Sequence, residues 1–257
     1  MKLYVMYNGL ADDFPREAMA CSGAPLDPKD CISIPTTTIL IDHPKAGYIL
    51  YDTGWTSREK LTFPTSPDEY IVNTLDRIGV KPEEIKYLIL SHLHKDHAGN
   101  LEPFKNAEFI VSELEFLQVA SLLLQNKISG AYVAADIEAW TKANYKWRLI
   151  REQYEVVDFV DGVKLISLGS GHAFGILALL VQLPKTGNII IASDAIYGSI
   201  NVGPPILPPG VIMDPPGWHK SLAYLQEKAK EYDAAIWYGH DLAQFQTLTT
   251  ADEGYYE

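Results

Sequence analysis

The stretch Ser91-His92-Leu93-His94-Lys95-Asp96-His97 places four potential metal ligands within six residues. It directly follows an apolar run that has the composition of a buried strand. A tight loop at the end of such a strand can turn His92 and His94 towards one ion. Asp96 and His97 can then reach a second ion, and imidazole and carboxylate are ligands that zinc accepts. A lone histidine is more often structural than ligating, but this density of donors predicts a metal-binding loop.

The rest of the composition is that of an acidic globular protein. Its 257 residues are 47% apolar and 21% charged, which suits one large domain, residues 1–257, built from two β-rich halves. Acidic residues outnumber basic ones by 33 to 21, giving a formal net charge of −12. Such a field repels phosphate polymers and anionic membranes, so we expect neither nucleic acid nor a membrane as a partner. The sequence does not define an oligomeric state.

Two further features indicate a cytoplasmic protein. Cys21 and Cys31 lie far from every histidine cluster, and two unlinked thiols are the expected state in a reducing compartment. Residues 1–7 suggest a short strand ending before the polar pair Asn8-Gly9, and they lack the long apolar core of a signal peptide. No later stretch has the roughly 18 uncharged apolar residues of a membrane span.

Apolar periodicity predicts a chain in which strands and helices occur in both halves. A β-hairpin is expected within residues 35–52, and a rigid proline-rich loop over 203–217. The further strands are expected at 85–90, 108–111, 155–160, 163–168, 175–183, 188–192 and 234–238, and the helices at 68–80, 113–124, 134–145 and 218–232. This order predicts an α+β fold, a four-layer αββα sandwich, rather than a parallel βαβ fold.

The H-x-H-x-D-H pattern of the first stretch resembles the signature of the metallo-β-lactamase superfamily, and the order of later motifs is similar too. The resemblance implies that His172, Asp194 and His240, each expected at a strand end, complete the ligand set. It implies two divalent ions, zinc, held as follows: His92, His94 and His172 on one ion, Asp96, His97 and His240 on the other, and Asp194 bridging both.

Three more residues are interpreted beside this set. Asp52 in Asp52-Thr53-Gly54 matches the family's strand end, where an aspartate orients ligands from behind, although a local Asx-type turn explains the same motif. His43 falls in an expected turn and His219 in an expected helix, so both are interpreted as surface or structural residues.

Within the superfamily the chain resembles the N-acyl homoserine lactonases through Asp194-Ala195-Ile196-Tyr197, because in those enzymes a tyrosine at this spacing faces the substrate. The resemblance implies that a metal-bridging hydroxide attacks a small neutral lactone or ester, with Asp96 and Tyr197 as catalytic residues. Core packing is the alternative role for Tyr197. One departure from the family is the shortened run Ala98-Gly99-Asn100, which leaves the acyl-chain preference open.

Other functions stay open at this stage. A glyoxalase II-like thioesterase or another small-ester metallohydrolase would use nearly the same ligands, but residues 241–257 contain no Lys or Arg to bind glutathione. A non-enzymatic metal-binding sensor is a second alternative, because a fold alone does not define a function. The redox diiron branch resembles H-x-E-x-D, with a glutamate where this chain has His94, so the motif favours hydrolysis.

Overall fold

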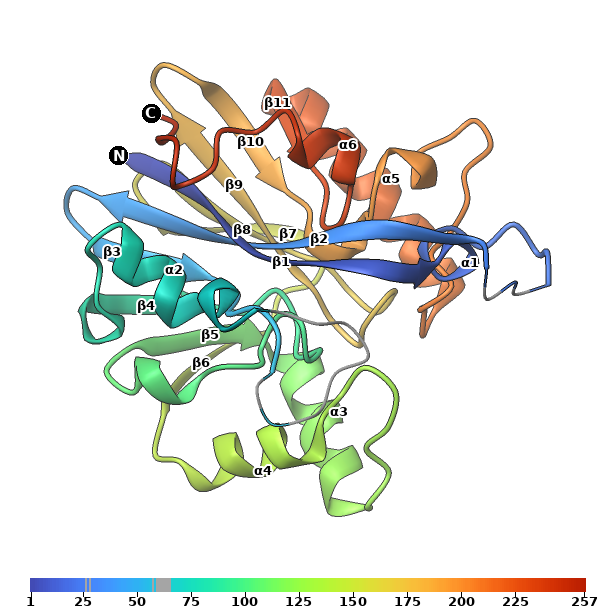
Figure 1. Cartoon of the computed structure of the whole chain (residues 1–257), viewed down its shortest axis with the longest axis horizontal. Helices are drawn as coiled ribbons and strands as arrows, with labels where there is room; N and C mark the ends of the chain where they lie inside the picture. Colours follow the sequence, from blue (N-terminus) through green and yellow to red (C-terminus); the bar gives the residue numbers. More distant parts are fainter. Residues whose placement is uncertain (26, 28, 57, 59–65) are drawn as a thin grey trace. The chain divides into compact units, whose positions relative to one another are not determined.

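The computed structural model describes residues 1–25, 27, 29–56, 58 and 66–257, and within these ranges the strands form two sheets (Figure 1). The first sheet has six strands in the order β1-β2-β3-β4-β5-β6. Their bounds are β1 Lys2–Pro15, β2 Cys31–His43, β3 Gly47–Tyr51, β4 Ile85–Ile89, β5 Glu108–Ser112 and β6 Lys146–Ile150. β2 and β3 form the expected hairpin, closed at the pair His43 and Gly47.

From β3 onwards this sheet is parallel, since β3 pairs with β4, β4 with β5 and β5 with β6 in the same direction. Parallel neighbours need long crossover connections, and those connections carry helices. They hold α2 Ile71–Arg77, α3 Glu113–Leu124 and α4 Ala134–Lys142, with the 3₁₀ turns η1 Pro67–Glu69, η2 Pro82–Glu84 and η3 Glu102–Phe104. The connection between β4 and β5 is the ligand-rich loop, so it emerges at the carboxyl end of a buried strand.

The second sheet has five strands in the order β11-β10-β9-β8-β7. Their bounds are β7 Glu155–Val160, β8 Val163–Ser167, β9 Leu177–Leu183, β10 Gly187–Ile191 and β11 Ala234–Trp237. β7 to β10 form an antiparallel meander, and β11 returns parallel to β10 after helix α5 Pro215–Glu231. The remaining elements are α1 Arg16–Met19, α6 Leu242–Phe245, η4 Ser193–Ala195 and η5 Ser199–Asn201.

Helix α5 shows how sequence defines an element and its buried face. Asp214 caps its N-terminus by accepting a hydrogen bond from Gly217 N at 3.1 Å, and prolines fill the first helical positions, where no N–H is needed. Trp218 and Leu222 are buried on one face, where they join the core formed by β8, β9 and β10. This apolar face is what fixes the helix to the second sheet.

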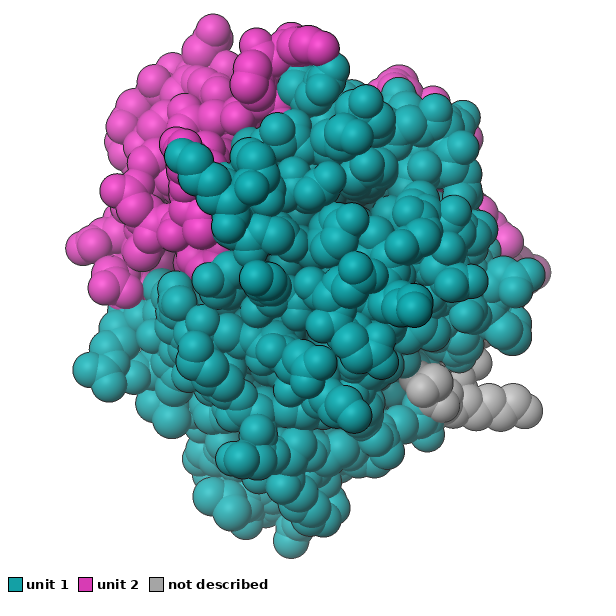
Figure 2. Space-filling model, turned by 90° about the vertical axis from the view of Figure 1, so that its left-hand side faces the viewer, with its two compact units in different colours: residues 1–9, 36–151, 249–257 teal, residues 10–35, 152–248 magenta. Residues whose placement is uncertain are grey.

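The chain separates into two compact units (Figure 2). Unit 1 comprises residues 1–9, 36–151 and 249–257, and unit 2 comprises residues 10–35 and 152–248. The two ends of the chain lie side by side in unit 1, where Leu3 pairs with Tyr256. The interpretation of residues 1–257 as one domain stays a prediction.

The structure differs from the expected elements at three places. β1 continues through Asn8-Gly9 to Pro15, because Thr38 donates a buried hydrogen bond to Asn8 Oδ1 at 2.8 Å and so satisfies the polar side chain. β6 was not expected, and α5 begins at Pro215, inside the loop predicted over 203–217. Cys21 and Cys31 are unlinked, as expected.

Candidate metal centre

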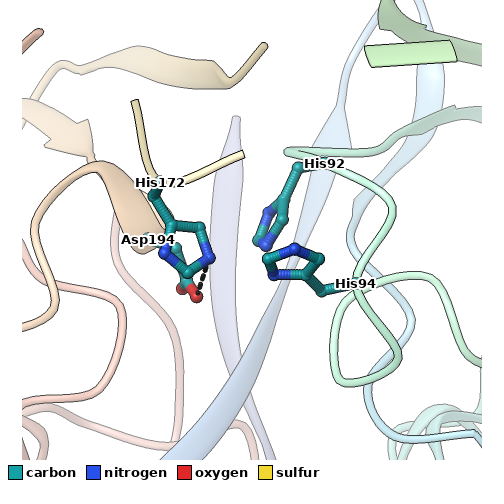
Figure 3. A group of neighbouring side chains, drawn as sticks. All are labelled: His92, His94, His172 and Asp194. Atoms are coloured by element: carbon teal, nitrogen blue, oxygen red, sulfur yellow. Dashed lines mark ion pairs between the residues drawn. The ribbon is translucent and has the colours of Figure 1, made fainter. Parts of the chain in front are cut away.

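The loop that follows β4 holds a cluster of imidazoles in unit 1. His92, His94 and His97 are all buried, with at most 4% of each residue exposed. The ring centroid of His92 lies 4.4 Å from that of His94 and 4.3 Å from that of His97, and Figure 3 shows the first pair side by side. Asp96 and His97 also present ligand atoms within 4.8 Å of each other. The four predicted ligands of this loop therefore lie together.

Asp52, which follows β3, connects to this loop through its carboxylate. Oδ1 accepts a hydrogen bond from Ser91 N at 2.7 Å, and Oδ2 accepts one from Ser91 Oγ at 2.8 Å. Oδ2 also lies 2.8 Å from His97 Nδ1. Burial raises the pKa of Asp52, while His97 and Ser91 act in the opposite direction. These contacts favour the orienting role of Asp52 over a local turn.

The same contacts define which nitrogen of each ring can bind a metal. Because Asp52 accepts from His97 Nδ1–H, the Nε2 of His97 carries a lone pair. Ser91 Oγ donates to Asp52 and lies 2.9 Å from His92 Nδ1, so it can accept from that nitrogen and leave the His92 Nε2 lone pair for a metal. Ser91 was not singled out from the sequence, although it directly precedes the first histidine.

A close backbone approach holds the loop against residues 53–56. Thr53 N donates to His97 O, and Thr56 N donates to Lys95 O, both at 2.7 Å. A Cβ added to Gly99 would lie 2.1 Å from Thr56 N, so only glycine fits this position. The close approach of Thr56 therefore explains why a glycine stands in the shortened run Ala98-Gly99-Asn100.

Unit 2 contributes a second group of donors centred on Asp194 in η4. His172 Nε2 lies 3.2 Å from Asp194 Oδ2, the contact dashed in Figure 3, and His240 Nε2 lies 3.1 Å from Oδ1. All three residues are buried. Each carboxylate oxygen of Asp194 therefore faces a different imidazole.

The opposite nitrogens of these two rings bind backbone carbonyls. His172 Nδ1 lies 2.7 Å from Val211 O, and His240 Nδ1 lies 2.9 Å from Pro35 O. With Nδ1–H donating to a carbonyl, a neutral ring turns its Nε2 lone pair towards the negative carboxylate. Such an arrangement is repulsive unless a metal ion, or the second proton of an imidazolium, lies between nitrogen and oxygen. The donor set of unit 2 therefore fits divalent metal ions.

Tyr197 lies beside both histidines of unit 2. Its ring centroid is 5.1 Å from that of His172 and 5.2 Å from that of His240, and 4% of the residue is exposed. Tyr197 O also accepts a hydrogen bond from His240 N at 2.8 Å. A Cβ on Gly239 would lie 2.9 Å from Asp194 Oδ1, so glycine is needed next to His240. Tyr197, one of the two residues predicted to be catalytic, thus lies beside the predicted ligands of unit 2.

The two remaining histidines lie outside these groups, as expected. His43 Nδ1 accepts hydrogen bonds from Lys45 N and Ala46 N in the β2–β3 turn, which is a structural role. His219 is exposed on α5. Sequence reasoning missed the carbonyls of Pro35 and Val211, because a backbone oxygen leaves no side-chain signal.

Comparison with known proteins agrees with the fold and the donor groups. Residues 34–173 match the family described as the Metallo-beta-lactamase superfamily. The chain belongs to this superfamily. Its fold class and its enzyme class, a metal-dependent hydrolase, are thereby confirmed, and its His/Asp donor groups support two divalent metal ions.

The relatives define the branch more narrowly. N-acyl homoserine lactonase AiiB of Agrobacterium fabrum is 32% identical over 239 residues, which cover 88% of this chain and 86% of that protein. N-acyl homoserine lactonase AiiA of Bacillus thuringiensis subsp. kurstaki is 30% identical over 233 residues, covering 85% and 86%. A solved N-acyl homoserine lactone hydrolase, with N-hexanoyl-L-homoserine bound at its catalytic metal centre, is 25% identical with a TM-score of 0.81, covering 100% and 98%. The resemblance to N-acyl homoserine lactonases is confirmed.

Among the residues that the structure describes, no helix combines the length and the apolar character that crossing a bilayer requires.

Proposed function

We propose that this protein opens the ring of N-acyl homoserine lactones, using two zinc ions bound by the seven predicted histidine and aspartate ligands. The similarity to lactonases over 88% of the chain carries the choice of substrate. The geometry around Asp194 supports the metals, because each of its oxygens faces an imidazole whose other nitrogen is held by a carbonyl.

The proposed ligands divide into two sets joined by one carboxylate. His92, His94 and His172 would hold the first ion, Asp96, His97 and His240 would hold the second, and Asp194 would be shared by both. When bound, two divalent ions would lower the pKa of a water between them towards about 7, which would supply hydroxide at neutral pH.

The side chains of this chain then have separate tasks. Tyr197 is buried beside His172 and His240. Its phenol donates a hydrogen bond to the oxygen of the lactone carbonyl, where negative charge develops. Asp96 is the least buried of the predicted ligands, with 15% of its side chain exposed. Its carboxylate would accept a proton from the attacking water and pass it to the ring oxygen that leaves the carbonyl carbon.

We also propose a small neutral substrate and a cytoplasmic location. Acidic residues outnumber basic ones by 33 to 21, and the resulting negative net charge repels polyanions. The unlinked state of Cys21 and Cys31 agrees with a reducing compartment.

A rate comparison on the zinc-loaded protein tests the proposal. N-hexanoyl homoserine lactone and a glutathione thioester are offered separately, and kcat/KM is measured for each. We expect the lactone to be hydrolysed much faster. Faster hydrolysis of the thioester would favour a glyoxalase II-like enzyme, and hydrolysis of neither would remove the proposed function.

A further inference from the structure

Glu115 is a completely buried carboxylate that points at the ligand loop of unit 1. It lies in the first turn of α3 and has a relative exposure of 0%. Its Oε1 accepts one hydrogen bond from Leu93 N and another from the phenol of Tyr132, both at 3.0 Å. Leu93 is the residue between His92 and His94, so this oxygen holds the backbone between two predicted ligands.

Tyr132 contacts the same loop with its ring. The centroid of the Tyr132 ring lies 4.5 Å from that of His94, with the planes at 73°, the edge-to-face geometry that aromatic rings prefer. The neighbouring Ala131 O accepts a hydrogen bond from Lys95 N at 2.9 Å. The backbone is therefore held on both sides of His94, at Leu93 and at Lys95, and the Tyr132 ring packs against the imidazole of His94.

Helix capping does not explain the position of Glu115. The spacing Ser112-x-x-Glu115 is that of a capping box, in which the glutamate would turn back to the helix N-terminus. In the part of the chain that the structure describes, the Ser112 side chain makes no capping hydrogen bond to α3. The carboxylate is instead directed to Leu93 and Tyr132, although burying it costs folding free energy that an apolar residue would avoid.

We infer that Glu115 and Tyr132 are a positioning pair for His94. The shared oxygen of Glu115 fixes both the backbone at Leu93 and the phenol of Tyr132, and the Tyr132 ring then fixes the imidazole of His94. Neither residue touches the reacting atoms in this scheme. The inference rests on the proposed function only through the assignment of His94 as a metal ligand.

Cobalt titration of the metal-free protein tests this pair without any lactone. Tyr132→Phe keeps the ring but removes the hydroxyl that Glu115 holds. We expect cobalt to bind about tenfold more weakly at one of two sites, with an altered visible absorption spectrum, because outer contacts of a ligand tune metal affinity. Tyr145→Phe is the matched control, since Tyr145 stacks on Phe109 with centroids 4.5 Å apart, and it should titrate like the wild type.

Substitutions of Glu115 separate positioning from simple packing. Glu115→Met has a similar length but no acceptor, and it should weaken cobalt binding as Tyr132→Phe does. Glu115→Gln retains an oxygen that can accept both hydrogen bonds, so it should restore the wild-type affinity and spectrum. Circular dichroism of each metal-free variant shows whether it is folded before the titration.

Wild-type affinity and spectrum in Tyr132→Phe would overturn the inference, as would a Glu115→Gln variant as impaired as Glu115→Met. Both outcomes are distinct from failure of the proposed function, which would appear as a wild-type protein that binds two cobalt ions but opens no lactone.

Discussion

At the scale of single residues, the two roles of Tyr197 predict different effects of removing its hydroxyl. The ring packs near His172, His240 and Phe14, and Tyr197→Phe leaves all of these contacts in place. If the phenol donates to the lactone carbonyl, its loss should cost about 1 to 3 kcal/mol of transition-state stabilisation, or roughly tenfold to a hundredfold in rate. Metal content and melting temperature should stay unchanged. Unchanged kcat/KM together with a lower melting temperature would assign Tyr197 to packing.

Asp194 allows a second prediction at this scale, because it is the residue proposed to bridge the ions. Asp194→Asn replaces a carboxylate by a neutral amide, which is a poorer bridge between two cations. Metal content by elemental analysis and turnover should fall together. Asp158→Asn is the matched control, since Asp158 is an exposed carboxylate paired with Lys164. Two bound ions and full activity in Asp194→Asn would contradict the bridging assignment.

At the scale of elements, the edge strand β6 is joined to β5 by charged pairs. Glu108 lies opposite Lys146 in the register, 3.2 Å from its Nζ, and binds Arg148 through two hydrogen bonds of 3.0 Å. Burial raises the pKa of Glu108, but the hydrogen bonds and charges of Arg148 and Lys146 outweigh it, so the pKa lies below its usual 4.5. The stability that this carboxylate contributes is therefore present above pH 4.5 and is lost as the pH falls through the lowered pKa.

Glu108→Gln tests this contribution. Because Arg148 and Lys146 are partly exposed, we expect the free energy of unfolding to fall by only about 0.2–1 kcal/mol at pH 7. The difference from the wild type should shrink as the pH falls below 4.5, where the wild-type carboxylate becomes protonated. Urea unfolding of both proteins at several pH values measures this difference in the free energy of unfolding. A difference that grows with acidification would contradict the assigned sign.

Elements of unit 1 show which helices and strands can be predicted from the sequence. β4 and α3 follow the expected ranges 85–90 and 113–124 closely, because apolar periodicity is the strongest local signal. β6 was missed because it has only five residues, among them the charged Lys146 and Arg148, and the glutamate that pairs with them lies in another strand. Local sequence therefore predicts buried elements better than edges stabilised from elsewhere in the chain.

At the scale of the whole molecule, the predicted ligands fall into two groups with unequal sequence signals. The four ligands of unit 1 occur within six residues, and their spacing alone indicates a metal loop. His172, Asp194 and His240 in unit 2 occur singly, and only the family resemblance linked them. The structure then groups them around Asp194 and adds the carbonyls that orient the rings, which no side-chain pattern could show.

If the seven predicted ligands bind two ions, metal removal should lower the stability of the folded chain. An ion that binds only the folded state adds roughly 4 kcal/mol when its free concentration is about 1,000 times its Kd. At roughly 2–4 °C per kcal/mol for chains of this size class, the loss of each such ion should lower the melting temperature by roughly 8 to 16 °C. Added zinc should restore the melting temperature, whereas zinc-saturated chelator should have no effect. An unchanged melting temperature in chelated protein, shown by elemental analysis to be metal-free, would mean that bound ions do not stabilise the folded chain.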